Sequence, residues 1–151
     1  MSINLLFIGK RDSLFQEAED HFKQLIAPHA KLAIVPIFNA RIKKAQEISR
    51  EAAQKSYTEA FTPHLSSSFK IALSEKGRQL DSLAFAKLIS LHSAISFFVG
   101  GSYGFEADFL SLADMTLSLS PLTLSHELAR AVLLEQIYRA CAINAHHPYH
   151  K

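Results

Sequence analysis

A cluster of glycines is the first feature of the chain whose residue types could support chemistry. Of the five glycines in the chain, Gly100, Gly101 and Gly104 stand within one short stretch. A backbone without side chains can come close to a ligand, so its N–H and C=O groups could bracket an adenine ring or an amino-acid moiety. Taken alone, the same stretch is more simply a tight turn.

The C-terminal end is the second such feature. No acidic residue follows Glu135, whereas the segment His147–Lys151 combines imidazole, phenol and ammonium groups. A cationic end with an aromatic ring suits a polyanion such as RNA. A solvated basic tail is an alternative interpretation, and clustered histidines can also bind a metal. Because Pro148 breaks helical spacing among these histidines, we predict no metal ligands here.

The pattern around these features predicts an α/β protein. Short apolar runs bounded by turn residues predict strands at 3–8, 32–37, 69–73, 94–99 and 115–119. Apolar residues at helical spacing predict helices at 13–26, 41–60, 82–89, 105–113 and 125–145. This alternation is typical of a three-layer α/β sandwich with a mainly parallel sheet. No stretch has the composition of a linker, so we expect residues 1–151 to form a single domain.

Individual segments allow more specific predictions. The run at 94–99 is apolar enough to be buried on both faces, which predicts a central strand. Pro36 lacks the N–H that a sheet ladder needs, which predicts an edge strand or a short one. Residues 41–60 carry only a thin apolar stripe, which predicts one surface helix. Residues 74–77 predict a turn that ends the third strand, and Cys141 is expected in the core.

The ends of three predicted strands form the candidate binding site. Ligands of open α/β sheets bind beyond the carboxyl ends of the strands. Leu73, the glycine stretch after Val99 and the segment Leu119–Leu124 lie at such ends. The spacing G-G-x-x-G is not the dinucleotide fingerprint, and the sequence has no phosphate-binding P-loop or nucleophile elbow. The sequence therefore argues against nucleotide hydrolysis and against a serine hydrolase.

Composition excludes several further classes of protein. A hydrophobic content of 48% with a formal net charge of +2 excludes a disordered chain. The apolar runs are too short for a membrane span, and a single cysteine excludes an internal disulfide framework. The N-terminal run Ile3–Ile8 is too short for a secretory signal, so we expect a cytoplasmic protein without a membrane partner.

Short motifs along the chain, taken together, resemble a known family. The motifs are Leu73–Leu80, Val99–Gly104, Leu119–His126, Glu135–Ala140 and His147–Lys151. Each is weak alone, but their order, spacing and terminal position resemble ribosomal RNA large-subunit methyltransferase H. That family comprises the pseudouridine N3-methyltransferases of the SPOUT, or α/β-knot, superfamily. The likeness covers nearly the whole chain.

The resemblance implies a fold, a cofactor, a partner and a substrate. It implies a deep trefoil knot at the C-terminal end, which is rare among proteins. The knot would hold S-adenosylmethionine, with contacts from Leu73, Gly100, Gly101, Leu119, Ser120, Pro121, Leu122, Thr123 and Leu124. It also implies a homodimer in which the partner's C-terminal tail helps to close each site. The implied substrate is a pseudouridine in the helix 69 stem-loop of 23S rRNA, in the large subunit of an assembled ribosome.

The C-terminal side chains then become candidate catalytic residues. N3 of pseudouridine must lose a proton before it attacks a methyl group, and we hypothesise that His150, helped by Tyr149, receives that proton. Arg139 would hold a phosphate or the uracil oxygens. Two alternatives remain open: a non-catalytic RNA-binding or ribosome-assembly factor with the same fold, and a SPOUT methyltransferase that acts on tRNA.

Overall fold

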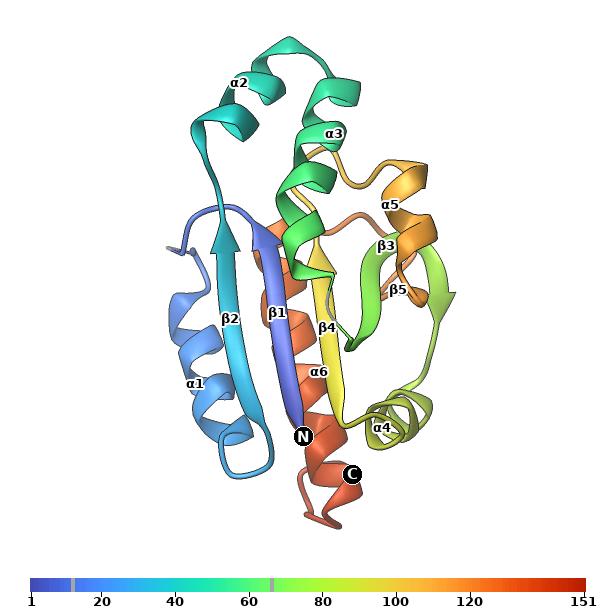
Figure 1. Ribbon diagram of the computed structural model, residues 1–151. Helices are drawn as coiled ribbons and strands as arrows, with labels where there is room; N and C mark the ends of the chain where they lie inside the picture. Colours follow the sequence, from blue (N-terminus) through green and yellow to red (C-terminus); the bar gives the residue numbers. More distant parts are fainter. Residues whose placement is uncertain (12, 66) are drawn as a thin grey trace.

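Parallel strands form a five-stranded sheet in the order β2-β1-β4-β3-β5, as the computed structural model shows (Figure 1). The strands are β1 (Ser2–Ile8), β2 (Lys31–Ile37), β3 (Phe69–Gln79), β4 (Ala94–Val99) and β5 (Met115–Ser118). Every neighbouring pair in this sheet is parallel. The structure describes residues 1–11, 13–65 and 67–151.

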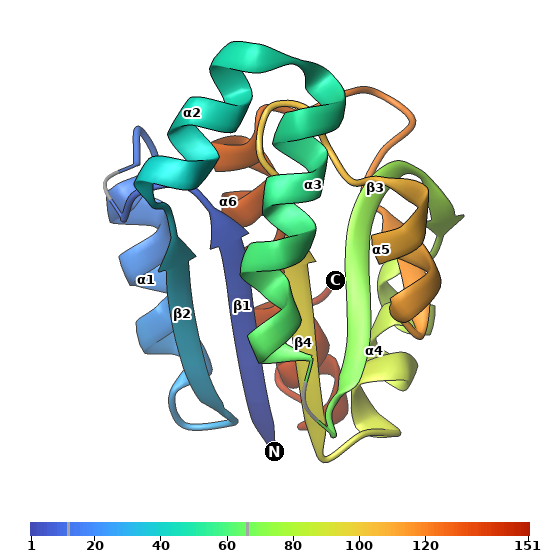
Figure 2. The same ribbon diagram turned by 45° about the horizontal axis from the view of Figure 1, so that its top comes forward.

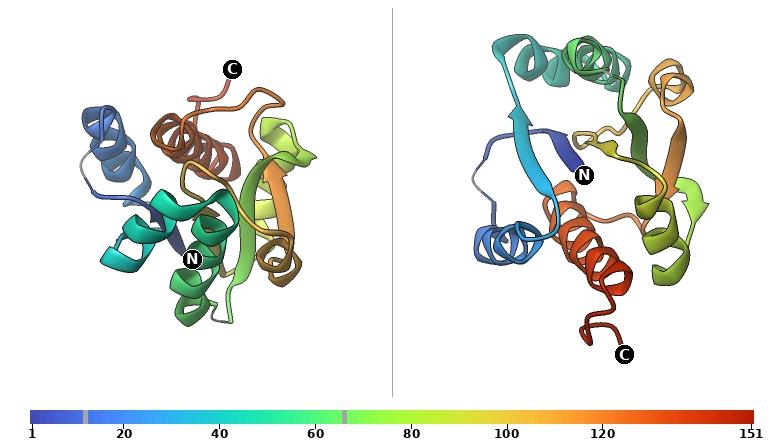
Figure 3. Two further views of the ribbon diagram at one scale, coloured as in Figure 1. Left: turned by 90° about the horizontal axis from the view of Figure 1, so that it is seen from above. Right: turned by 60° about the horizontal axis from the view of Figure 1, so that its bottom comes forward.

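Helices cover both faces of the sheet (Figures 2 and 3). One face is covered by α1 (Gln16–Ile26), α4 (Ser82–Ser90) and α6 (His126–Asn144). The other is covered by α2 (Ala40–Ile48), α3 (Arg50–Phe61) with the 3₁₀ turn Thr62–His64, and α5 (Ala107–Leu112). The predicted three-layer α/β sandwich with a parallel sheet is therefore confirmed. The C-terminal knot implied by the resemblance stays a prediction.

Strand β4 lies at the centre of the sheet, between β1 and β3. Its side chains alternate between two cores: Phe97 packs with α1, α4 and α6, whereas Phe98 packs with α3 and α5. Both rings are fully buried. The predictions of a central strand here and of an edge strand at Pro36 are both confirmed. Cys141 is buried in the first of these cores, as expected, and burial raises the pKa of its thiol.

The prediction of one surface helix over residues 41–60 is wrong. Ser49 has an extended backbone, with φ −166° and ψ 166°, and it separates α2 from α3. Its N–H donates to the carbonyl of Ala45, and its hydroxyl accepts from the N–H of Ala52 at 3.0 Å. One serine thus ends α2 and caps α3. The break between the two helices therefore needs neither a glycine nor a proline. The bend lets α3 bury Tyr57 and Phe61 against the sheet.

The prediction of a turn at residues 74–77 is also wrong, because β3 continues to Gln79. Its pairing with β5 shifts between Leu73 and Arg78, both of which lie opposite Leu117. Such a bulge bends a strand without ending it. A Cβ on Gly77 would lie 2.7 Å from the carbonyl carbon of Thr116, so the close approach of the two strands requires glycine.

Helix α6 is held to α1 by a buried ion pair. Nε of Arg130 lies 3.1 Å from Oε1 of Glu19, and the two side chains are 1% and 4% exposed. The guanidinium carbon of Arg130 also lies 3.7 Å from the ring centre of Phe7. Because α6 begins at the carboxyl edge of the sheet, this pair fixes the position of its first turns.

Removal of one partner of this pair should destabilise the fold strongly. We expect Glu19→Gln to lower the free energy of unfolding by about 3–5 kcal/mol, because it leaves the Arg130 cation buried without a counter-charge. Urea denaturation measures this loss. The matched control is Glu59→Gln, which breaks the exposed Arg41–Glu59 pair and should cost less than about 1 kcal/mol. Equal losses in the two variants would contradict the prediction.

Candidate active site

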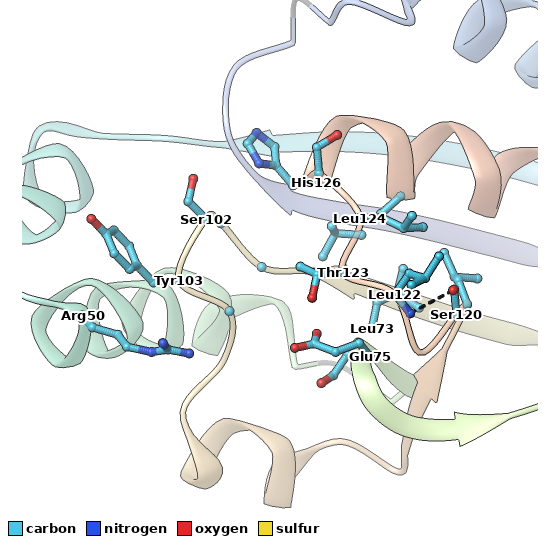
Figure 4. Close-up of a pocket in the computed structure, with 18 residues that line it drawn as sticks. Arg50, Leu73, Glu75, Ser102, Tyr103, Ser120, Leu122, Thr123, Leu124 and His126 are labelled. Carbon is cyan, nitrogen blue, oxygen red and sulfur yellow. Dashed lines mark hydrogen bonds between the residues drawn. The ribbon is translucent and has the colours of Figure 1, made fainter.

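A cavity of about 690 Å³ lies beyond the carboxyl ends of β4 and β5 and beside the bulged part of β3 (Figure 4). All of the cofactor contacts implied by the resemblance line it, except Pro121: Leu73, Gly100, Gly101, Leu119, Ser120, Leu122, Thr123 and Leu124. The volume lies within the range of small-molecule sites, about 300–1,000 Å³. The three segments that the sequence predicted at strand ends therefore meet at one cavity, although β3 itself continues beyond Leu73. The binding of a cofactor by these residues stays a prediction.

Sequence reasoning missed several residues that line the same cavity. Arg50 enters it from the first turn of α3, Glu75 from the bulged part of β3, and His126 from the first turn of α6. Arg50 was missed because the segment was predicted to be one surface helix. Glu75 was missed because it fell in a predicted turn. His126 had a signal in the sequence, since it ends the motif that begins at Leu119.

The glycines serve to pack the loop against the protein. A Cβ on Gly101 would lie 2.5 Å from the phenol oxygen of Tyr57, and a Cβ on Gly100 would lie 3.3 Å from the carbonyl carbon of Gly104. The directions that side chains would take are therefore filled by protein atoms. Gly104 has φ +71°, a left-handed conformation that favours glycine. We interpret the glycine stretch as a tight loop that packs against α3. One side of this loop borders the cavity.

Helix α3 holds this loop in place. Nε2 of Gln54 donates to the carbonyl oxygen of Tyr103 at 2.8 Å. The phenol of Tyr57 donates to Oε1 of Gln46 at 2.5 Å, and burial raises its pKa, so the phenol stays protonated and remains a donor. Positions 50, 54 and 57 share one face of a helix. The same face of α3 therefore supports the glycine loop and supplies a wall of the cavity.

The C-terminal tail folds back onto the end of α6. His146 has φ 56°, the N–H of His146 donates to the carbonyl of Ile143, and the N–H of His147 donates to the carbonyl of Ala142 at 2.8 Å. This is a Schellman motif, which ends a helix and reverses the chain. The ring of Tyr149 then packs against that of Tyr138, with centroids 4.6 Å apart. The tail is therefore an ordered part of the fold.

Glu135 holds two of the three predicted catalytic side chains. Its Oε1 accepts from Nε of Arg139 at 3.1 Å and from the phenol of Tyr149 at 2.9 Å. The carboxylate raises the pKa of Arg139, whereas burial and then the bond to Glu135 raise the pKa of Tyr149. Both groups are therefore protonated at neutral pH. Sequence reasoning missed Glu135 as a site residue, although it begins one of the motifs.

Arg139 also determines what His150 can do. Nη1 of Arg139 lies 3.2 Å from Nδ1 of His150. A guanidinium only donates hydrogen bonds, so Nδ1 is the acceptor and Nε2 carries the hydrogen of a neutral ring. In this arrangement His150 presents a donor to an incoming group. The hypothesis that it receives a proton therefore requires the contact with Arg139 to open.

The cavity lies at the first turn of α6, whereas the tail cluster lies along the C-terminal half of this helix. Arg139 follows His126 by 13 residues, which corresponds to about 20 Å at 1.5 Å per residue. In Figure 1 the C-terminus lies near the bottom, whereas the arrowheads of β1, β2 and β4 point toward the top. One chain therefore does not bring His150, Tyr149 and Arg139 to the predicted cofactor contacts.

Comparison with known proteins identifies the family. The profile described as "Predicted SPOUT methyltransferase" matches residues 1–150. The chain belongs to the SPOUT methyltransferase family. This confirms the methyltransferase class implied by the sequence motifs.

Relatives of this SPOUT methyltransferase match it along its whole length. Proteins named "Ribosomal RNA large subunit methyltransferase H" are 44% identical over 153 residues in Sulfurovum sp. and 45% identical over 151 residues in Campylobacter jejuni subsp. jejuni, with 100% of both chains covered in each case. A solved structure described as a "probable methylase family protein" from Haemophilus influenzae has a TM-score of 0.60 at 17% identity. It covers 99% of this chain and 70% of its own, and it supports the fold alone.

The structure describes residues 1–11, 13–65 and 67–151 of this SPOUT methyltransferase. Within these ranges, the His, Cys, Asp and Glu side chains form no group of three that could hold a metal ion. No helix within them is both long enough and apolar enough to span a membrane.

Proposed function

We propose that this SPOUT methyltransferase transfers the methyl group of S-adenosylmethionine to N3 of a pseudouridine in helix 69 of 23S rRNA, in the assembled ribosome. The observation that carries the proposal is the cavity at the strand ends, lined by nearly all of the residues that the resemblance assigns to the cofactor. The printed names of its relatives support large-subunit rRNA as the substrate. The enzyme would meet ribosomes in the cytoplasm.

The chemistry of the cavity fits this cofactor. Leu73, Leu122 and Leu124 gather at one end and offer an apolar wall for an adenine ring, whereas Arg50 and Glu75 supply both signs of charge (Figure 4). When bound, the cofactor supplies a methyl group on a positively charged sulfur, an electrophile that mainly needs a nucleophile placed in line. The residues of the chain therefore bind the cofactor, orient the base and stabilise its charge.

We propose a homodimer because one chain cannot complete this site. Arg139, which contacts His150, lies about 20 Å along α6 from the cavity residue His126. In a symmetric dimer, each tail can approach the cavity of the other subunit. Leu122, on the rim of the cavity, is 74% exposed in the single chain, and a partner subunit would cover it.

The geometry of the tail supports a specific division of roles. In this arrangement the N3 proton passes to solvent water. His150 of the partner subunit donates from Nε2 to a uracil carbonyl oxygen next to N3, and so stabilises the negative charge that N3 then carries. Arg139 holds Nδ1 of His150 and offers its remaining N–H groups to phosphate or uracil oxygens. The phenol of Tyr149 donates to the carboxylate of Glu135, which also binds Arg139. The ring of Tyr149 packs against the guanidinium of Arg139, whose carbon lies 4.7 Å from the ring centre.

Transfer of a labelled methyl group tests the proposed function. Purified protein is incubated with methyl-tritiated S-adenosylmethionine and either assembled ribosomes, isolated large subunits or tRNA, and the labelled RNA is then mapped by mass spectrometry. We expect label on a helix 69 pseudouridine in ribosomes. Label on tRNA would favour the alternative tRNA enzyme, and absence of label from every RNA would favour a non-catalytic factor.

Mixed dimers should reveal whether the site is shared between subunits. One variant lacks residues 149–151. The other carries Gly101→Val, whose side chain would meet Tyr57 and should displace the glycine loop beside its cavity. Each variant alone should be nearly inactive on ribosomes. After co-refolding in equal amounts, half of the dimers should be mixed, and each mixed dimer should hold one complete site out of two. We therefore expect about a quarter of wild-type activity. Methyl transfer to ribosomes measures this. A mixture as inactive as its components would argue against the shared site.

A further inference from the structure

Arg50 and Glu75 form a pair of opposite charges inside the cavity. Arg50 enters from the first turn of α3, and Glu75 enters from the bulged part of β3. Figure 4 shows the guanidinium of Arg50 beside the glycine loop, pointing toward Glu75, while the carboxylate of Glu75 points from beside Leu73 toward the loop; both residues line the cavity. Both charges therefore face the same space.

Neither charge is used by the fold. Among the residues that the structure describes, the side chains of Arg50 and Glu75 have no hydrogen bond or ion pair, and both side chains are exposed and line the cavity. Their groups are therefore free to contact a ligand. The leucines at the other end, Leu73, Leu122 and Leu124, leave the cavity divided into an apolar part and a charged part.

The backbone that carries Arg50 is held firmly. Ser49 caps α3 through its bond to the N–H of Ala52 at 3.0 Å, which fixes the first turn. One turn further along the same face, Gln54 bonds the carbonyl of Tyr103 in the glycine loop. The Cα of Arg50 thus has a fixed position relative to the loop, although its side chain is exposed.

We infer that Arg50 binds the α-carboxylate of the methyl donor and that Glu75 binds its α-ammonium group, so that the pair selects the amino-acid end of the ligand. This rests on the proposed function, because it assigns the ends of the proposed cofactor. A guanidinium binds a carboxylate through two parallel N–H groups, and a carboxylate accepts from an ammonium group. The apolar part of the cavity is then left for the adenosine.

Two product-like ligands separate this inference from the proposed function. S-Adenosylhomocysteine carries the amino-acid end, whereas 5′-methylthioadenosine is the same nucleoside thioether without it. Calorimetry should show that the wild-type protein binds S-adenosylhomocysteine more tightly. We expect Arg50→Gln and Glu75→Gln each to weaken S-adenosylhomocysteine about 10-fold, the loss of one charged hydrogen bond, and to change the affinity for 5′-methylthioadenosine less than 2-fold. Arg50→Lys should lose less than Arg50→Gln, because it keeps the charge.

Matched variants and opposing outcomes complete the test. Lys55→Gln removes an exposed cation from α3, and Glu47→Gln removes an exposed anion from α2; neither residue lines the cavity, and both variants should bind as wild type. Equal weakening of both ligands, or of neither, in Arg50→Gln and Glu75→Gln would overturn the inference while leaving the cofactor proposal intact. Loss of ribosome methylation with unchanged ligand affinity would instead assign Arg50 to RNA and overturn the inference. Failure of the wild-type protein to bind either ligand would overturn the cofactor proposal itself.

Discussion

Replacement of His150 by alanine should lower the turnover of saturating ribosomes by about 100- to 1,000-fold, the usual loss when a donor to developing negative charge is removed. The affinity for S-adenosylhomocysteine should not change, because His150 does not line the cavity of its own chain and its proposed contact in the dimer is with uracil and not with the cofactor. Single-turnover methyl transfer with preformed ribosome complexes measures the chemical step directly.

His150→Gln distinguishes a donor from a proton acceptor. The hydrogen bond from Arg139 leaves His150 with a donor at Nε2, and a glutamine amide can supply a similar N–H. We therefore expect His150→Gln to lose only about 10-fold, well above the alanine variant. If His150 accepts the N3 proton, both variants lose an equal factor, about 10²–10⁴, because an amide is no base. Equal losses would favour the proton acceptor and imply that Arg139 releases Nδ1 when RNA binds.

Gly101→Ala should weaken S-adenosylhomocysteine by about 10- to 100-fold. The new methyl group would lie 2.5 Å from the phenol oxygen and 2.6 Å from the ζ-carbon of Tyr57. Tyr57 is fully buried and bonded to Gln46, so the glycine loop has to move instead. Overpacking of this kind costs about 1–3 kcal/mol. Calorimetry with S-adenosylhomocysteine measures the affinity, and urea denaturation shows whether the fold survives.

A compensating variant identifies the cause of that loss. Tyr57→Leu shortens the side chain that the new methyl group meets, so Gly101→Ala/Tyr57→Leu should regain most of the affinity. Tyr57→Leu alone is the control for the loss of the phenol and its bond. An unchanged affinity in Gly101→Ala would show that the loop tolerates the displacement. A loss that Tyr57→Leu does not relieve would place the effect elsewhere than at this contact.

The local pattern of the sequence predicted the elements of the fold well where burial in the sheet determines that pattern. The strand at 94–99 is apolar on both faces because both of its faces are covered, and the position of Pro36 at an edge follows from its missing N–H. The predictions failed where a feature other than a glycine or a proline determines whether an element ends. The hydroxyl of Ser49 separates two helices, and the bulge opposite Leu117 lets β3 run on beyond Leu73. Neither effect is visible without the neighbouring backbone.

The candidate site was predictable only in part for a similar reason. Parallel strands bring their carboxyl ends to one edge, so the amino-acid sequence alone was enough to group Leu73, the glycine loop and Leu119–Leu124. The contribution of α3 depended on its bend and on its packing against the loop, which no local pattern reports. The glycines were correctly singled out, but their close neighbour is Tyr57. The relation between the cavity and the tail required the length and direction of α6.

The reversed C-terminal tail has a consequence for the thermodynamics of RNA recognition. A flexible segment loses about 1–2 kcal/mol of conformational entropy per residue when it is fixed, and binding must compensate for that loss. Here the Schellman turn at His146 and the packing of Tyr149 on Tyr138 fix the tail when the protein folds. Ribosome binding through this tail should therefore lack the large negative heat-capacity change of coupled folding. It should resemble the docking of a rigid surface, with an affinity governed mainly by charge and by salt concentration.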